Sequence, residues 1–272
     1  MDLKCKNIIL PIVVIFMFIS ACCAQKKSTM NIKTETINYV SGGVSLTGVL
    51  AYDSNVSTKR PVVLVIHEWW GLNDYIRSRV KQLAQLGYFA MAIDLYGNGN
   101  TAKTLDEAVA LSTPLYQNSN LAKSRFDAAI TKVKTYIQAD TTQIAAIGYC
   151  FGGTMALNMA RMGAPLIGVV SFHGSLKGVP AKKELLTSKI LICHGEEDKF
   201  VKKEEVEAFK KEMDSIGADY IFKQYPNATH AFSNPDATEW GKKFNIPIAY
   251  NEAADFASWK EMQLFFTKIF KK

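Results

Sequence analysis

A cysteine stands in this chain at a position typical of a nucleophile. Residues 148–153 read G-Y-C-F-G-G, directly after a short apolar strand pattern and directly before a helical one. Glycines two positions before and two positions after Cys150 leave room for a sharp strand-to-helix turn, which in the G-x-S-x-G pattern presents a serine. Here a thiol replaces the hydroxyl. The pattern therefore indicates nucleophilic attack by Cys150 on a carbonyl carbon, with a covalent intermediate.

A nucleophile on such a turn needs a base and an acidic group that orients the base. In this arrangement they follow in the chain order nucleophile, acid, histidine. Asp198 lies in the loop after an apolar strand pattern at 189–194, and His230 lies in the loop after the next one, at 220–225. Because the carboxyl ends of parallel strands meet at one edge of a sheet, we expect both side chains beside Cys150.

Other residues of the same types lie in comparable places. The remaining candidates are His173 and His194 for the base, and Glu196, Glu197 and Asp94 for the acid. We prefer His230 because, of the four histidines, it alone follows the acid in chain order and precedes a last helix. Asp198 is preferred among the acids.

Strand and helix patterns alternate along the chain. Strands are expected at residues 44–52, 61–66, 88–93, 144–147, 166–172, 190–194 and 220–225, and helices at 75–86, 105–111, 121–137, 154–162, 204–216 and 252–270. Continuous apolar runs such as 61–66 are typical of strands buried on both faces of a parallel sheet. The alternation predicts an α/β fold with a doubly wound, mostly parallel sheet and helices on both faces.

Charge and cysteine content exclude several classes of protein. The formal net charge of +7 comes from scattered lysines, which is typical of a solvated surface and argues against a nucleic-acid partner. The five cysteines are too few and too unevenly placed for a disulfide framework. Cys193, inside an apolar strand pattern, is expected to be a small core residue. No C-x-x-C pair or His/Cys metal spacing occurs.

The N-terminus has the pattern of an export signal. Two lysines precede an apolar stretch at 8–19, which is too short for a membrane span. The following I-S-A-C resembles a bacterial lipobox, so we expect residues 1–21 to be removed and Cys22 to be lipidated, with residues 22–33 as a tether. Ordinary cleavage after Ala24 is the alternative. Residues 34–272 then form a single domain.

Four short motifs together resemble the dienelactone hydrolase family of the α/β-hydrolase fold. They are H-E-W-W-G at 67–71, D-L-Y-G-N-G at 94–99, G-Y-C-F-G-G at 148–153 and H-A-F at 230–232. The cysteine in the third motif is the family's most distinctive mark. The resemblance covers nearly all of the chain after the export signal, and it implies that Cys150, Asp198 and His230 form a catalytic triad.

The resemblance also implies roles for neighbouring residues. In the family, the glutamate at the position of Glu68 interacts with the thiol and assists its ionisation when substrate binds. A thiol beside a carboxylate stays protonated, whereas a nearby imidazolium favours the thiolate. A solvated loop carboxylate is the alternative for Glu68. The backbone N–H groups of Trp69 and Phe151 would stabilise the oxyanion during cleavage of an ester or lactone through a thioester, without a metal or organic cofactor.

The substrate pocket departs from the family pattern. Members that cleave dienelactone bind its carboxylate with two arginines, but residues 231–235 and 101–120 of this chain contain none, so a different substrate is expected. Trp70, Tyr96 and Phe232 are expected to form an aromatic pocket wall. Trp240, in a loop at 235–250, could cap the site.

The overall prediction is an ester or lactone hydrolase anchored by lipid in a bacterial cell envelope, acting on a small molecule and favoured to be a monomer. One alternative is a ligand-binding or sensing lipoprotein that has the same fold but no useful turnover. The other alternative is a redox role for Cys150, but the chain contains no recognisable motif with a resolving cysteine.

Overall fold

One mixed sheet carries the structure. The computed structural model describes residues 30–271 and contains an eight-stranded sheet in the order β1-β2-β4-β3-β5-β6-β7-β8. The strands are β1 (Ile32–Ser41), β2 (Val44–Asp53), β3 (Arg60–Ile66), β4 (Phe89–Ile93), β5 (Ala139–Tyr149), β6 (Gly168–Phe172), β7 (Lys189–Gly195) and β8 (Tyr220–Tyr225). The pairs β1–β2 and β2–β4 are antiparallel and all others are parallel, as the alternating pattern predicts.

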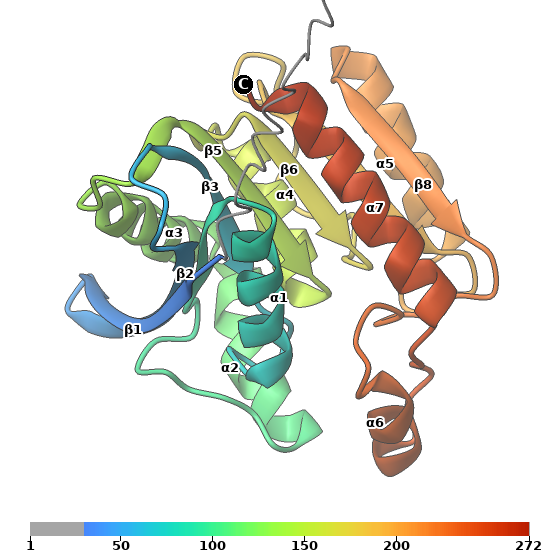
Figure 1. Cartoon of the computed structure of the whole chain (residues 1–272). Helices are drawn as coiled ribbons and strands as arrows, with labels where there is room; N and C mark the ends of the chain where they lie inside the picture. Colours follow the sequence, from blue (N-terminus) through green and yellow to red (C-terminus); the bar gives the residue numbers. More distant parts are fainter. Residues whose placement is uncertain (1–29, 272) are drawn as a thin grey trace, which may run out of the picture.

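Helices cover both faces of this sheet (Figure 1). They are α1 (Asp74–Gln85), α2 (Leu105–Gln117), α3 (Ser119–Val133), α4 (Phe151–Arg161), α5 (Lys203–Ile216), α6 (Ala237–Phe244) and α7 (Glu252–Ile269). Side chains of α1 and α7 belong to one buried cluster, and those of α3, α4 and α5 belong to the other. Within residues 30–271, none of the helices combines the length and the apolar character that crossing a bilayer requires.

Alternation along the central strands explains these two layers of core. In β3, Val62, Leu64 and Ile66 pack toward α3 and α4, whereas Val63 and Val65 pack toward α1 and α7. All five side chains are fully buried. Because successive side chains of a strand point to opposite faces, only a continuous apolar run can fill both layers.

Three features differ from the sequence-based expectations. The strand β1 begins at Ile32, inside the expected tether. Only two of its ten side chains are buried, so this edge strand has no strong apolar pattern by which the sequence could predict it. Helix α2 continues through Pro114 to Gln117 because Leu115 packs in the core. The expected loop at 235–250 contains α6. The export signal, Cys22 and residues 22–29 of the tether lie outside the described residues.

The turn between β5 and α4 requires glycine at two positions. Cys150 has a φ of +53° and a ψ of −117°, outside the regions that side chains favour. A Cβ on Gly148 would lie 2.0 Å from the carbonyl oxygen of Gly152, and a Cβ on Gly152 would lie 2.3 Å from the carbonyl oxygen of Ile66. Only glycine allows α4 to start this close to β3.

Gly152→Ala should therefore destabilise the protein strongly. We expect its free energy of unfolding to fall by about 2–3 kcal/mol, because the new methyl group meets backbone that cannot move aside. The control is Gly217→Ala at the end of α5, where φ is +67° but the space is open, with an expected loss of about 1 kcal/mol. Urea denaturation measures both, and equal losses would contradict this account of the turn.

Candidate active site

The predicted site residues meet at the carboxyl ends of the parallel strands. Cys150 follows β5 and is the residue before α4, so its side chain lies at the N-terminus of that helix. Its backbone N–H donates to the carbonyl oxygen of Phe172 at 3.0 Å and to Nδ1 of His173 at 3.1 Å. Two acceptors from the end of β6 thus hold the strained backbone of Cys150 in place.

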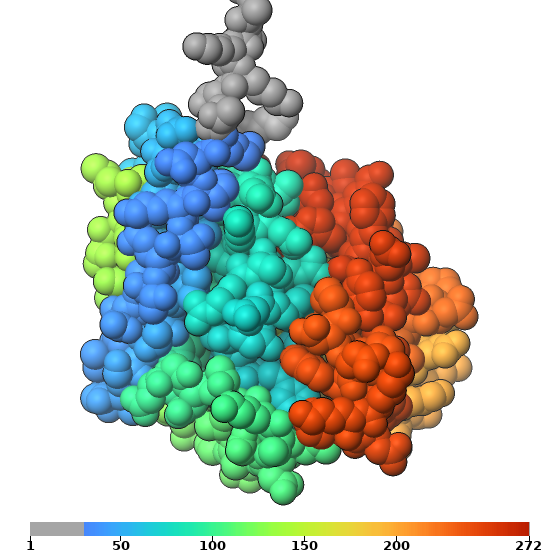
Figure 2. Space-filling view, turned by 60° about the horizontal axis from the view of Figure 1, so that its bottom comes forward, coloured from blue at the N-terminus to red at the C-terminus, as the bar shows by residue number. Residues whose placement is uncertain are grey.

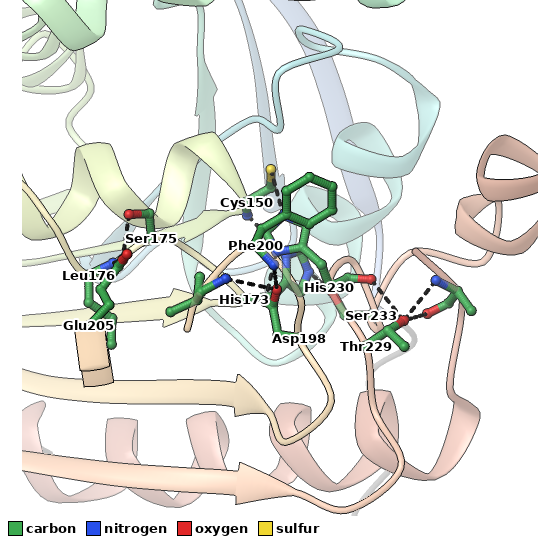
Figure 3. Close-up of polar contacts among 12 residues, drawn as sticks. Cys150, His173, Ser175, Leu176, Asp198, Phe200, Glu205, Thr229, His230 and Ser233 are labelled. Carbon is green, nitrogen blue, oxygen red and sulfur yellow. Dashed lines mark hydrogen bonds and ion pairs between the residues drawn. The ribbon is translucent and has the colours of Figure 1, made fainter. Parts of the chain in front are cut away.

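His230 lies between Cys150 and Asp198 (Figure 3). Its Nδ1 is 2.8 Å from Oδ2 of Asp198, and its Nε2 is 3.0 Å from Sγ of Cys150. The residue is 8% exposed, and its ring packs edge-on against Phe200, with ring centroids 5.0 Å apart. The structure therefore brings together the three residues that the sequence analysis proposed as nucleophile, base and orienting acid.

Asp198 is held in its ionised form by its surroundings. Its Oδ1 accepts hydrogen bonds from the backbone N–H groups of Phe200, at 2.8 Å, and Val201, at 3.1 Å. Burial raises the pKa of this carboxyl, but His230 and the two N–H groups outweigh burial and lower the pKa below its ordinary value. Glu196 and Glu197, the alternatives in the same loop, are exposed.

The charges around His230 favour its protonated form. Burial by itself would lower the pKa of the imidazole. The negative charge of an ionised Cys150 and the hydrogen bond to Asp198 act in the opposite direction, and together they raise the pKa well above its ordinary value. An imidazolium at His230 is thus stabilised by Asp198 and by any negative charge that develops on the adjacent sulfur.

His67 and His173 are each bound through both ring nitrogens, and His194 makes no described hydrogen bond to Cys150, so none of the three is placed as the base. Nε2 of His67 accepts from the backbone N–H of Leu95, so Nδ1 donates to the carbonyl oxygen of Glu68. Burial lowers the pKa of His173 well below its ordinary value; its Nδ1 accepts from the Cys150 N–H, so its Nε2 donates to Ser233 Oγ at 2.7 Å. His194 packs against Phe222.

Asp94, another alternative acid, stabilises a loop. Its two oxygens accept four backbone N–H groups, from Thr47, Tyr96, Gly97 and Gly99. Among the described residues, no hydrogen bond joins the Asp94 side chain to a histidine.

Glu68 is buried rather than solvated. Its side chain is 2% exposed, and its Oε2 accepts a hydrogen bond of 2.6 Å from Nδ2 of Asn234. Burial raises the pKa of Glu68 to about 7, although the bond from Asn234 and the charges of His230 and Arg79 partly oppose this. A carboxyl group that changes charge near neutral pH thus lies in the site.

A cavity of about 300 Å³ joins these groups. Its lining includes Glu68, Trp69, Trp70, Cys150, Phe151 and His230. Trp70 also stacks on Phe244 and contacts Trp240, so α6 supports the cavity wall from behind. Figure 2 shows this edge of the molecule, where the α2 region, in green, lies beside the segment that contains α6, in orange.

Two of the three expected pocket residues do not line the cavity. Phe232 is fully buried and packs against His173 and Tyr225 in the core below the site. Tyr96 lies beneath the wall, where its ring contacts Phe151 and its hydroxyl donates to the carbonyl oxygen of Trp69 at 2.9 Å. The expectation for both residues is corrected, because their rings fill core space instead of the cavity.

The two candidate oxyanion donors have suitable positions. Phe151 is the first residue of α4, and the first N–H groups of a helix have no intrahelical acceptor. The peptide of Trp69 is held by the Tyr96 hydroxyl on its carbonyl oxygen and by a turn in which Gly71 N–H donates to Glu68 O at 3.0 Å. Both residues line the cavity beside Cys150.

Sequence reasoning missed the polar residues behind the site. Ser233 Oγ bonds both His173 and, at 2.8 Å, the hydroxyl of Tyr75, while Arg79 donates to the carbonyl oxygen of Ser233 at 2.7 Å. Asn234, in the same segment, holds Glu68. The only available signal was that two polar residues, at 233–234, come three and four positions after His230.

Cys150 and Cys193 are both free thiols. Cys193 lies in the core and accepts a hydrogen bond from the Tyr225 hydroxyl. In the part of the chain that the structure describes, no three side chains of His, Cys, Asp or Glu are grouped as metal ligands would be.

The chain is similar to known proteins over most of its length. Residues 46–270 match the dienelactone hydrolase family. A protein of Aquifex aeolicus (strain VF5), provisionally named a carboxymethylenebutenolidase, is 29% identical over 206 residues, which cover 74% of this chain and 87% of that protein.

Two solved structures are similar as well. The crystal structure of P91, a dienelactone hydrolase-like promiscuous phosphotriesterase from metagenomic libraries, has a TM-score of 0.82 and 31% identity, covering 88% of this chain and 99% of that one. The structure named m3DLH has a TM-score of 0.80 and 34% identity, with coverage of 88% and 99%.

The matched region contains every strand of the parallel part of the sheet and the loops that carry Cys150, Asp198 and His230. It agrees with the four motifs that suggested the family from the sequence. The chain therefore belongs to the dienelactone hydrolase family of the α/β-hydrolase fold, a family of hydrolases that act on lactone and ester bonds.

Proposed function

We propose that the protein cleaves a carboxylic ester or lactone through a thioester on Cys150, with His230 as the base and Asp198 as its orienting acid. The observation that carries this proposal is the position of one imidazole ring. Its two nitrogens lie 2.8 Å from Asp198 Oδ2 and 3.0 Å from Cys150 Sγ. Such contacts are what proton transfer from a nucleophile to an oriented base requires.

Acylation is the first step. Cys150 Sγ attacks the carbonyl carbon while Nε2 of His230 takes up the thiol proton. The N–H groups of Trp69 and Phe151 stabilise the negative charge that develops on the carbonyl oxygen. When the tetrahedral intermediate collapses, the bond to the leaving oxygen breaks and His230 gives its proton to that oxygen. An acyl thioester remains on Cys150.

Deacylation returns the enzyme to its starting state. His230 removes a proton from water as the water oxygen attacks the thioester carbonyl. The C–S bond then breaks to release the acid, and His230 returns its proton to the sulfur of Cys150. Asp198, ionised and bound by two backbone N–H groups, keeps the Nε2 of His230 directed at the reacting atoms. No step needs a metal or an organic cofactor.

Glu68 adjusts the charge of the site. When it is ionised, its carboxylate favours the imidazolium of His230 and disfavours a second negative charge on Cys150. When it is protonated, it adds no charge. Asn234 holds the side chain in one position in the cavity wall. We place Glu68 as the group that a bound substrate displaces or neutralises, which would release the thiolate for attack.

Membrane attachment is a separate proposal, and the sequence alone supports it. The I-S-A-C run after an apolar stretch is suited to export and lipidation of Cys22. Acyl chains on the new N-terminus would anchor the protein in the cell envelope.

Removing the thiol tests the reaction. Cys150→Ala should lower kcat/KM for short p-nitrophenyl esters at least about 10⁴-fold while the circular dichroism spectrum stays unchanged. The matched control is Cys193→Ala, which removes the other described free thiol from the core and should keep turnover. Retained cleavage in Cys150→Ala would disprove the nucleophile. A folded wild-type protein without turnover or adduct would favour the ligand-binding alternative.

The buried carboxyl of Glu68 should appear in the pH dependence of stability. Below pH 4.5 this group is protonated in both the folded and the unfolded state; as pH rises to about 7, only the unfolded state ionises readily, so the folded state loses stability. Glu68→Gln removes that loss. We expect its free energy of unfolding to exceed that of wild type by about 3 kcal/mol at pH 8 and to match it near pH 4.

Urea denaturation at the two pH values measures this difference. Glu184→Gln, which changes an exposed glutamate in the same way, is the control and should have little effect at either pH. A Glu68→Gln protein that is no more stable than wild type at pH 8 would show that the carboxyl carries no burial cost.

Cys22→Ala tests the anchor. In a bacterial host, the full-length variant should move from the membrane fraction to the soluble fraction, because no acyl chains can be attached. Cys23→Ala, at the adjacent cysteine, should stay with the membranes. Equal fractionation of the two variants would refute lipidation at Cys22.

A further inference from the structure

The geometry points to an uncharged, predominantly apolar ester as the substrate, because the cavity around Cys150 offers no cation to a charged one, and Thr113 on α2 is the position where an added cation would reverse this selectivity. The inference rests on the proposed thioester chemistry and adds the class of acyl group that the cavity accepts.

Among residues 30–271, no lysine or arginine lines the cavity that contains Cys150. The nearby arginines are committed elsewhere. Arg79 is paired with Asp255 and donates to the carbonyl oxygen of Ser233, and Arg125 donates to the carbonyl oxygen of Leu95. His230 can carry a positive charge, but its two ring nitrogens already contact Asp198 and Cys150.

A substrate carboxylate would therefore be poorly stabilised. It would lose hydration on entering a cavity of about 300 Å³ and would find no cation to replace the water. The buried carboxyl of Glu68 lies in the same cavity, so wherever Glu68 is ionised an ionised substrate group would also meet a like charge there. An uncharged substrate has neither cost.

Two of the four hydroxyl groups of the cavity wall are bound to the protein itself. Ser112 Oγ donates to the carbonyl oxygen of Ala108, one turn earlier in α2, at 2.7 Å. Ser175 Oγ donates to Glu205 Oε1 at 2.6 Å, a contact visible at the left of Figure 3. The wall consequently presents mainly carbon to a ligand.

The mouth of the cavity is apolar and open to solvent. Val109 and Tyr116 on α2 are each 50% exposed, and Phe200, in the loop after β7, is 47% exposed. All three line the same cavity. Large apolar groups at the rim of a site are stabilised when a ligand covers them, at about 25 cal/mol per Å². An apolar acyl chain would cover them and a charged one would not.

Thr113 is the residue at which charge can be added with least disturbance. It is half-buried on α2, it lines the cavity between Val109 and Tyr116, and no other described side chain bonds its hydroxyl. A cation at this position would lie in the cavity wall, where it would pair with the carboxylate of a bound substrate.

The test compares two esters of the same shape. p-Nitrophenyl valerate ends in a methyl group, and the monoester of glutaric acid with p-nitrophenol ends in a carboxylate at the same place. We expect wild-type kcat/KM to be at least about 100-fold higher for the valerate. Thr113→Arg should reduce this ratio at least about 10-fold by improving the KM for the glutarate, whereas Thr113→Gln, of similar length but uncharged, should leave the ratio unchanged.

The possible outcomes separate the proposed selectivity from the proposed thioester chemistry. Similar kcat/KM values for both esters, lost in Cys150→Ala, would overturn the selectivity and leave the thioester chemistry intact. Absence of Cys150-dependent turnover for either ester would overturn both. If Thr113→Arg does not fold, Val109→Arg and Val109→Gln repeat the comparison at an exposed rim position, and an unchanged ratio in the arginine variant would contradict the inference.

Discussion

The backbone of Cys150 is the constraint on which the rest of the site depends. Its φ of +53° is tolerated because glycines on both sides let α4 start against the end of β3, and because two acceptors at the end of β6 bind its N–H. This conformation directs the thiol away from the sheet into the cavity.

The sheet supplies the partners of Cys150 because its parallel strands end together. Loops after β3, β5, β6, β7 and β8 meet at one edge, so residues far apart in the chain lie within hydrogen-bond distance. The segment after β8 carries much of this arrangement: His230 contacts the thiol, Ser233 bonds His173, and Asn234 bonds Glu68. A change in this one segment would alter the base, the support of the elbow and the buried carboxyl together.

Electrostatic balance then determines the chemistry. Asp198 is ionised because it is well bound, whereas burial raises the pKa of Glu68, which accepts a single described hydrogen bond, to about 7. Two carboxyl groups a short distance from one imidazole can thus serve different purposes. The difference comes from their surroundings, not from their residue types.

The sequence was sufficient for the features that depend on local pattern. Apolar runs predicted the central strands and a mostly parallel sheet, and the glycine positions and the chain order of the candidates predicted the meeting of Cys150, Asp198 and His230. It was insufficient where three-dimensional packing decides. Phe232 and Tyr96 were expected in the pocket because they are aromatic and close to site residues in the chain, but their rings fill the core. The contact between Asn234 and Glu68 joins residues 166 positions apart, which no local pattern can reveal.

The central claim is that substrate acylates the sulfur of Cys150, and a rapid acid quench tests it most directly. The protein is mixed with excess p-nitrophenyl butyrate, quenched within milliseconds to seconds, digested and examined by mass spectrometry. The account predicts one butyryl group, removable by hydroxylamine, on the peptide that contains Cys150. Turnover without that adduct, or a butyryl group on another residue that forms as fast as product, would contradict it.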